Sequence, residues 1–304
     1  MSTIPLAKGY NPEKLEFPVV LSEKLDGVPV CLSVKVAKDG RVVSWGVFTR
    51  QGEEAKSCYT IVRDWVSTNL SFFEGFAGTH NVVGELVQTA NIRADFKDTG
   101  GIARRQECQG TLLSWGLFDY FWDGGDESYF DRFSYFGGKQ QSTDNVWVIP
   151  AFICRDQIAL DQNFAEFMHN HPEAEGMVAR SFNDTFRAGK RNWGYQKMLN
   201  EPTIDLRIVS VEEAVEAKTG LGKGMVGRLV AEYNGTTIGI GPGKLTHAER
   251  KDLLKVWLTA SYGATKPYTL PRIAQIKYKA GGGYNALRQP TFQHWRDDKD
   301  TPDA

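Results

Sequence analysis

The sequence predicts an α+β protein of two domains, with antiparallel sheets in residues 1–202 and a small Greek-key β-barrel in residues 203–304. Three observations lead to this prediction. The chain of 304 residues is long enough for two ordinary domains. Segments of alternating apolar and polar residues indicate strands, and a few stretches with helical spacing separate them. After Pro202 the chain becomes a series of short strands and turns with one helix.

The composition is that of a globular protein. Hydrophobic residues make up 41% of the chain and charged residues 24%. No apolar run approaches the ~20 residues of a bilayer span, and the first residues lack the apolar core of a signal peptide. The cysteines at positions 31, 58, 108 and 154 are too few and too widely spaced for a disulfide framework or a Cys-x-x-Cys site. Reduced thiols and a cytoplasmic location without a membrane partner are therefore expected.

Basic residues gather in two parts of a chain whose net charge is only −1. Residues 180–197 contain five basic residues against one aspartate, and residues 266–299 contain seven against two. Such runs usually mark solvated faces, but their separation from acidic residues also fits a groove that follows phosphates.

The first predicted element is a β-hairpin that follows the segment SEKLDG, Ser22 to Gly27. Alternation over Val28 to Val36 predicts a strand, and Asp39-Gly40 predicts a tight turn into the next one. Lys24, at the mouth of this sheet beside the permissive Gly27, is the first candidate for a nucleophile. Its amine can attack only when neutral, which requires a pKa below the ordinary ~10.4. The pattern Lys-x-Asp-Gly also occurs by chance at solvated turns, so partners decide its meaning.

The remaining elements of the first domain follow from periodicity. A core-facing helix is expected where apolar residues recur at Ile61, Val62, Trp65, Val66 and Leu70. Strands are expected at residues 81–87, 111–122, 146–153 and 176–180, and a helix at 160–169. The polar residues 91–109 predict a long exposed loop, and His169 and His171 are expected at the surface.

Several side chains in these elements are candidates for a site. Glu85 interrupts an apolar strand, where a carboxylate is either paired structurally or part of a site, and Glu175 repeats this situation at the head of another strand. Phe118 belongs either to the core or to a platform for a flat ligand such as a purine. Arg50 and Lys197 lie at the ends of strands.

The second domain begins with strands at residues 204–211 and 225–233, a hairpin turn at Asn234-Gly235 and a strand at 237–241. Thr246 to Glu249 forms a capping box for a helix that runs through Trp257. A final strand at residues 272–280 and the glycines 281–283 lead into a basic tail. This content suits a barrel of the oligonucleotide-binding type.

The order of these residues resembles the motifs of the covalent nucleotidyltransferases, which include ATP-dependent DNA ligases, RNA ligases and messenger-RNA capping enzymes. The resemblance implies that Lys24 attacks the α-phosphate of a nucleoside triphosphate and carries the nucleotide as a phosphoramidate. It implies that Arg50 in FTRQG and Glu85 in GEL contact the ribose, and that Phe118 in LFD stacks on adenine. It assigns Glu175 in EGMV, together with Glu85, to a metal. The further ATP- or AMP-binding residues that it implies are Ser22, Glu23, Val178, Arg180 and Lys197.

The tail, residues 284–299, resembles the last motif of DNA ligases, with matches at Arg288, Pro290, Arg296, Asp298 and Lys299. The resemblance covers nearly the whole chain and is closest to the short DNA ligases of bacteriophages. It implies an ATP-grasp-like nucleotidyltransferase domain followed by an oligonucleotide-binding barrel, and it adds Arg288, Arg296 and Lys299 to the ATP site. ATP, Mg²⁺ with Mn²⁺ as the alternative ion, nicked duplex DNA and a monomeric state are expected. In-line attack on a triphosphate needs cations and a hard metal ion more than it needs acids or bases.

Two positions depart from the family pattern. Pro29 stands where DNA ligases usually carry an arginine, and Leu199 stands where they carry a second lysine. Lys190, Arg191 or Arg180 is the candidate to supply the missing charge, and Lys197 with the metal is expected to lower the pKa of Lys24. The alternatives are an RNA ligase, a GTP-dependent capping guanylyltransferase and a catalytically silent DNA-binding protein of the same fold.

Overall fold

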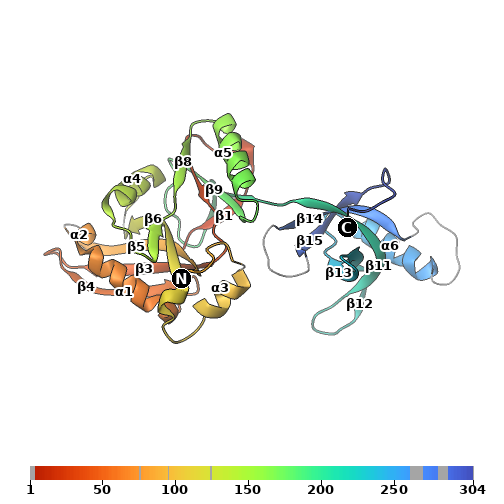
Figure 1. Ribbon diagram of the computed structural model, residues 1–304, viewed down its shortest axis with the longest axis horizontal. Helices are drawn as coiled ribbons and strands as arrows, with labels where there is room; N and C mark the ends of the chain where they lie inside the picture. Colours follow the sequence, from red (N-terminus) through yellow and green to blue (C-terminus); the bar gives the residue numbers. More distant parts are fainter. Residues whose placement is uncertain are drawn as a thin grey trace. The chain divides into compact units, whose positions relative to one another are not determined.

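The computed structural model describes residues 4–74, 77–94, 96–123, 125–260, 270–279 and 287–303. The chain divides into two compact units, one up to Asn200 and one from Glu201 onward (Figure 1). Both units mix helices with sheets, as predicted. Within the described ranges, no helix combines the length and the apolar character that a membrane span needs.

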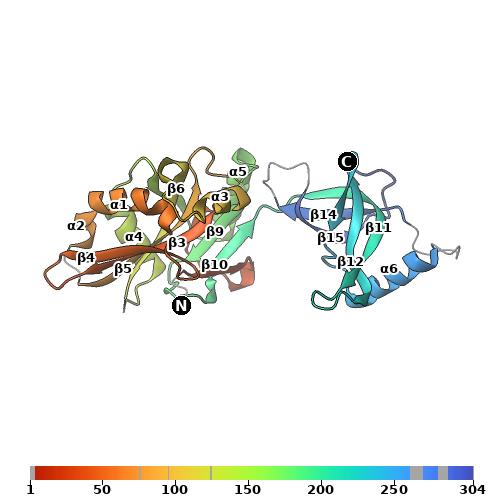
Figure 2. The same cartoon turned by 90° about the horizontal axis from the view of Figure 1, so that it is seen from below.

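The first sheet of the first unit has the strand order β4-β3-β5-β6-β7. Its strands are β3 (Val28–Val36), β4 (Val42–Thr49), β5 (Gly78–Gln88), β6 (Leu113–Trp122) and β7 (Val146–Val148). Helices α1 (Tyr59–Thr68), α2 (Leu70–Phe73), α3 (Phe96–Ala103) and α4 (Tyr129–Lys139) contribute to the core on one face (Figure 2). The rings of Trp65 in α1 and Trp115 in β6 meet edge to face at 6.0 Å in this core. The helices cover one face, so the other face remains available to the second sheet.

The second sheet of this unit has the order β1-β10-β9-β2-β8. Its strands are β1 (Leu6–Gly9), β2 (Val19–Glu23), β8 (Ala151–Cys154), β9 (Gly176–Ser181) and β10 (Arg191–Leu199). Leu21, Met177 and Ala179 pack on one face with Leu160 of α5 (Gln157–Asn170). Because successive side chains of a strand alternate between faces, Ser22, Val178 and Arg180 lie on the opposite face. Short 3-10 turns occur at Pro12–Lys14, Lys56–Cys58 and Gly110–Leu112.

The second unit is one antiparallel sheet with the order β13-β12-β11-β14-β15, covered by α6 (His247–Ala260). Its strands are β11 (Thr203–Val215), β12 (Gly222–Tyr233), β13 (Thr236–Ile240), β14 (Arg272–Lys279) and β15 (Arg288–Trp295). The sheet closes through Gly241, whose N–H donates to the Pro290 carbonyl at 2.9 Å and whose carbonyl accepts from the Phe292 N–H at 3.0 Å. The predicted turn has positive φ at Asn234 (48°) and Gly235 (74°). In the predicted capping box, the Thr246 N–H donates to Glu249 at 2.7 Å and the Glu249 N–H donates to Thr246 at 3.3 Å.

Several local predictions are wrong. The expected loop at residues 91–109 contains helix α3, which buries Thr99 and Ala103. The pair Gly100-Gly101 near its centre made a helix look unfavourable in the sequence. The expected strand at 146–153 is two strands, β7 and β8, in different sheets. Leu70 begins α2 and is 45% exposed, although periodicity placed it in the core.

Further elements escaped sequence analysis, among them the short strand β1. Helix α4 was not expected, because its polar residues and its glycine pair weaken the helical pattern. The strand ending at Lys279 is not the final one, since the tail itself forms β15. The glycines 281–283 and Lys266 lie outside the described residues.

Candidate active site

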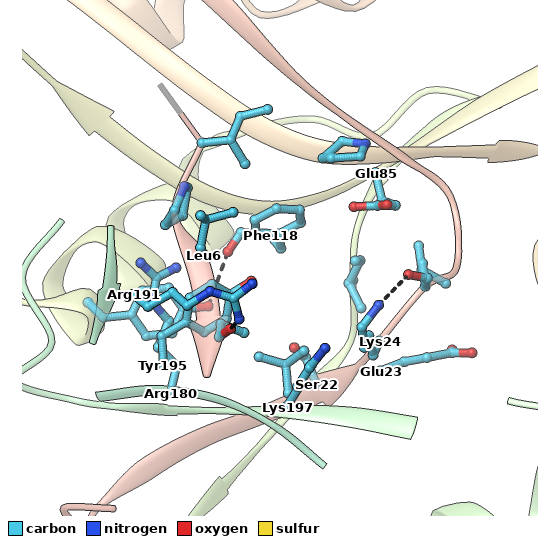
Figure 3. Close-up of a pocket in the computed structure, with 18 of the residues that line it drawn as sticks. Leu6, Ser22, Glu23, Lys24, Glu85, Phe118, Arg180, Arg191, Tyr195 and Lys197 are labelled. Atoms are coloured by element: carbon cyan, nitrogen blue, oxygen red, sulfur yellow. Dashed lines mark hydrogen bonds between the residues drawn. The ribbon is translucent and has the colours of Figure 1, made fainter. Parts of the chain in front are cut away.

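A cavity of about 210 Å³ lies between the two sheets of the first unit. In Figure 3, Ser22, Lys24 and Lys197 come from the second sheet and its loops, and Glu85 and Phe118 come from the first. Nine residues predicted for the site line this cavity: Ser22, Glu23, Lys24, Arg50, Glu85, Phe118, Val178, Arg180 and Lys197. Glu175, the remaining predicted residue of the first unit, does not line the cavity itself but contacts Lys24, which does. Residues from six different segments therefore converge on one cavity.

Lys24 is held by backbone contacts on both sides. Its N–H donates to the Gly176 carbonyl at 2.9 Å, which joins the end of β2 to the start of β9. A Cβ on Gly27 would lie 2.0 Å from the Leu86 carbonyl oxygen, so this glycine is required for the close approach of the loop to β5. That approach is what brings Lys24 to the strand that carries Glu85.

The Lys24 amine forms an ion pair with Glu175. Nζ donates to Oε2 at 2.5 Å, and the two side chains are 24% and 7% exposed. Burial lowers the pKa of Lys24, but the Glu175 and Glu85 carboxylates outweigh it and raise the pKa above its ordinary value. The pKa of Lys24 was expected to be lowered by Lys197 together with a bound metal, but in the chain without the metal it is raised. The reason is that two carboxylates face this amine.

Glu85 is the second carboxylate beside Lys24. Burial raises its pKa to about 7, Lys24 and Arg50 pull it back, and Glu175 adds to the rise. The carboxyl groups of Glu85 and Glu175 thus both lie near the Lys24 ammonium in a largely buried site. This arrangement favours the binding of a further cation.

A divalent metal fits these donors. Carboxylate oxygens are hard ligands of the kind that Mg²⁺ prefers. Over the described part of the chain, no group of three or more histidines, cysteines or acidic residues could hold a metal. Glu85 and Glu175 would therefore hold the ion together with oxygens from a substrate or from water.

Arg180 lines the cavity but is committed to a buried network. Its guanidinium lies 2.6 Å from Asp119 Oδ2 and donates to Asp184 Oδ2 at 2.9 Å. It lies between the rings of Tyr129 and Tyr195, with centroid distances of 4.2 Å and 4.6 Å. Burial opposes the charge, but Asp119 raises the pKa of Arg180 further. Arg180 thus fixes one wall of the cavity.

This network includes residues that sequence analysis missed. Arg132 of α4 donates to Asp119 Oδ1 at 3.1 Å, and both side chains are almost fully buried. Asp119 interrupts an apolar strand as Glu85 does, and this was the feature of the sequence that could have indicated a buried ion pair. Its partners lie farther along the chain, so local patterns could not identify them.

The two departures from the family pattern also have places in the structure. Pro29 pairs with Glu85 in the β3–β5 register and lines the cavity. Among the three candidates for the missing charge, Arg191 and Arg180 line the cavity and Lys190 does not. Arg191 keeps part of its guanidinium occupied by donating to the Ala7 carbonyl at 2.7 Å.

The predicted tail residues belong to the second unit. Arg296 Nη1 and Lys299 Nζ each lie 2.5 Å from Oδ2 of Asp205 in β11. Arg296 also donates to both oxygens of Asp298, at 2.9 Å and 2.7 Å. Both cations are thus neutralised by carboxylates within their own unit, and Arg288 lies at the start of β15.

Comparison with known proteins gives a structural match and no sequence match. No family model and no curated protein matches the chain. A structure from an analysis of Lig E DNA ligases, described as DNA binding with a minimal scaffold, is similar over 97% of this chain and 100% of that one. Its identity is 18% and its TM-score is 0.66. The chain has the fold of ATP-dependent DNA ligases.

Two further structures share this ligase fold. The protein named Pmar-Lig_PreS3 matches with a TM-score of 0.69 and 18% identity, covering 97% of this chain and 67% of that one. The ligase domain of LigD from M. tuberculosis matches with a TM-score of 0.51 and 18% identity, covering 98% of this chain and 96% of that one. The resemblance to DNA ligases is thereby confirmed at the level of the fold.

Proposed function

We propose that the chain is an ATP-dependent DNA ligase that seals nicks between a 5′-phosphate and a 3′-hydroxyl through a lysyl-AMP intermediate on Lys24. The observation that carries the proposal is the contact of Lys24 Nζ with Glu175 at 2.5 Å, at a cavity to which Glu85, Phe118 and Lys197 also contribute. A lysine amine can serve as a covalent nucleophile, and phosphoryl transfer needs positive charge at the phosphate oxygens, which Lys197 and a metal ion on the two carboxylates would supply.

Three steps make up the proposed reaction. The neutral Lys24 amine attacks the α-phosphorus of ATP, an N–P bond forms, and the bond to the bridging oxygen breaks as pyrophosphate leaves. An oxygen of the 5′-phosphate at the nick then attacks the phosphorus of the lysyl-AMP, a P–O–P bond forms, and the N–P bond breaks to release the Lys24 amine. The 3′-hydroxyl finally attacks the 5′-phosphorus, the phosphodiester bond forms as the hydroxyl loses its proton, and the bond to AMP breaks so that AMP leaves. Glu175 is the acceptor nearest to the proton that the Lys24 ammonium must lose first.

The site residues have distinct parts in this scheme. A divalent cation held by Glu85 and Glu175 would supply positive charge to the phosphate oxygens and weaken the attraction that keeps Lys24 protonated. Lys197, which lines the cavity with Ser22 and Val178, would bind phosphate. Phe118 offers a half-buried ring on the opposite wall for the adenine.

A nucleic-acid substrate is supported by a second cavity of about 370 Å³ beside the first. Lys8, Lys14, Arg187 and Arg191 line it with Trp193, and Arg191 lines both cavities. Lys8 Nζ lies 3.8 Å from the centre of the Trp193 ring, which is 40% exposed. Cations beside an exposed aromatic ring suit a phosphodiester strand. We also infer that the second unit is an oligonucleotide-binding barrel, because its five strands form one sheet that closes through Gly241.

Incubation with ATP or GTP labelled at the α-phosphate, followed by a denaturing gel, tests the proposal. We expect the label on the protein with ATP, and none on Lys24→Ala. Label from GTP would indicate a capping guanylyltransferase, and no label from either nucleotide would indicate a silent DNA-binding protein. Sealing of nicked duplex DNA in preference to RNA then separates a DNA ligase from an RNA ligase.

A further inference from the structure

Arg93 joins two segments of the first unit that carry reacting groups. It lies just after β5, in the turn that the Asn91 side chain forms by accepting from the Arg93 N–H at 3.1 Å. Its guanidinium donates to both carboxylate oxygens of Glu23, at 2.6 Å and 3.2 Å, and to Glu173 Oε1 at 3.0 Å. The Arg93 side chain is 21% exposed and that of Glu23 is 13% exposed. The Arg93–Glu23 part of the bridge is therefore largely withdrawn from solvent, whereas Glu173 is half exposed.

The positions of its two partners give this bridge its significance. Glu23 directly precedes Lys24, and Glu173 is two residues before Glu175. The backbone of this region is paired as well, because the Lys24 N–H donates to Gly176 and Glu23 pairs with Met177. Arg93 thus ties the segment of the amine to the segment of its carboxylate partner from outside the cavity, which neither Arg93 nor Glu173 lines.

The neighbour of Arg93 reinforces the same junction. Ile92 packs against the cluster formed by Leu25, Val87 and Ile149, so the turn is anchored next to the residue that follows Lys24. The same β5 strand carries Glu85. One short turn therefore connects the three strands or loops that bear Lys24, Glu85 and Glu175.

We propose that Arg93 is a positioning residue that holds Lys24 and Glu175 in register by binding Glu23 and Glu173 together. This inference rests on the proposed function of Lys24. Arg93 contacts none of the reacting groups, so its effect is on their alignment. Small misplacements of reacting groups can cost about 100-fold in rate.

The kinetic test compares Arg93→Ala with Arg228→Ala. Arg228 makes a similar forked ion pair with Glu212, at 2.7 Å and 2.9 Å, but in the second unit. We expect Arg93→Ala to slow single-turnover formation of the lysyl-AMP adduct by about 10- to 100-fold, with little change in the Kd for ATP. Arg228→Ala should leave both unchanged. Arg93→Lys, which keeps the charge but not the fork, should recover part of the rate.

A second measurement does not depend on catalysis. Hydrogen–deuterium exchange of peptides spanning residues 21–26 and 173–178 should be faster in Arg93→Ala than in the parent protein and in Arg228→Ala. Adding Glu173→Ala to Arg93→Ala should have less effect on adduct formation than Glu173→Ala alone, because the bridge is already broken.

The outcomes separate the two proposals. Unchanged exchange together with an unchanged adduct rate in Arg93→Ala would overturn the positioning role. A parent protein that forms no adduct while Arg93→Ala still exchanges faster would support the bridge and refute the ligase function. Faster exchange spread evenly over the whole first unit would show a general loss of stability and would overturn the specific role. Should Arg93→Ala fail to fold, Glu173→Gln, at a half-exposed site, provides the same comparison.

Discussion

Lys299 and Arg296 share one acceptor, Oδ2 of Asp205, which each approaches to 2.5 Å. Asp205 is almost fully buried. Its N–H also donates to the Asp303 side chain at Oδ2, and its carbonyl accepts from the Asp303 N–H at the end of the described tail. The cations that the ligase resemblance assigns to ATP thus have a second possible task, which is to fasten the tail to β11.

Arg296→Ala combined with Lys299→Ala distinguishes these tasks. If the cations serve ATP, self-adenylation should slow strongly, while pre-adenylated protein should still seal a nick at a substantial rate, because AMP and not pyrophosphate leaves in that step. Single-turnover assays of both steps provide the measurement. The melting temperature should also fall, since Asp205 loses its partners. Equal losses in adenylation and sealing would show that the pair acts on DNA or on folding alone.

Lys24→Ala and Lys24→Arg should both eliminate the covalent nucleotide. The first lacks an amine, and the guanidinium of the second does not lose its proton at useful pH. Intact-protein mass spectrometry after incubation with ATP and Mg²⁺ checks this, with the unmodified parent protein as the reference. An AMP-sized increase in mass on either variant would remove Lys24 from its proposed role.

Glu175→Gln removes the charge that pairs with Lys24 and leaves the side-chain volume almost unchanged. A loss of at least ~100-fold in adenylation is expected, the scale of one preorganised electrostatic contact. Rates are to be measured over a range of Mg²⁺ concentrations. Near-normal adenylation at saturating Mg²⁺ would show that Glu175 is structural.

The raised pKa of Glu85 predicts a pH-dependent stability. Because burial raises the pKa of Glu85 to about 7, the folded protein keeps this carboxyl protonated at pH values where the unfolded chain has lost the proton. The unfavourable contribution therefore grows as the pH rises from the ordinary value of about 4.5 towards 7. Glu85→Gln should raise the melting temperature at pH 8 and have little effect at pH 4. A gain that is independent of pH, measured by calorimetry without divalent ions, would contradict this assignment.

Cys108 should be the most reactive thiol of the described chain. Burial acts against its thiolate, but hydrogen bonds from Thr60 lower the pKa of Cys108, whereas burial raises the pKa of Cys58 to about 12. Cys31, Cys58 and Cys154 are buried and Cys108 is exposed. Iodoacetamide at pH 8 should modify Cys108 first, as followed by peptide mass spectrometry, and Thr60→Val should slow the reaction. Equal labelling of Cys58 in the native protein would be inconsistent with this structure.

The parts of the fold that sequence analysis predicted are those encoded by local pattern. The hairpin after Lys24 follows from alternation, and the helix at His247–Ala260 follows from the Thr246 capping box. Helix α3 was missed because Gly100-Gly101 lowers helix propensity, and burial of Thr99 compensates only in the folded protein.

In the candidate site, too, residues marked by the local pattern were predicted, and residues that depend on contacts between distant segments were not. Glu85 was conspicuous because a charge in an apolar strand demands a partner. Arg93 and Arg132 were not, because nothing next to them in the sequence signals Glu23 or Asp119 as partners. The pKa of Lys24 in the chain without a metal was not readable from the sequence for a related reason, since it depends on which carboxylates fold against the amine.

The hydrogen bonds between Gly241 and the β15 residues Pro290 and Phe292 limit the use of truncated proteins as a test of the tail. A sheet joined end to end leaves neither β13 nor β15 with a row of unsatisfied amides and carbonyls along the joined stretch. Removing the tail from Arg288 onward would delete β15 and leave β14 and β13 open to pairing with other chains. Aggregation would then accompany any loss of activity. Point substitutions that keep β15 intact are consequently the appropriate probes of the tail cations.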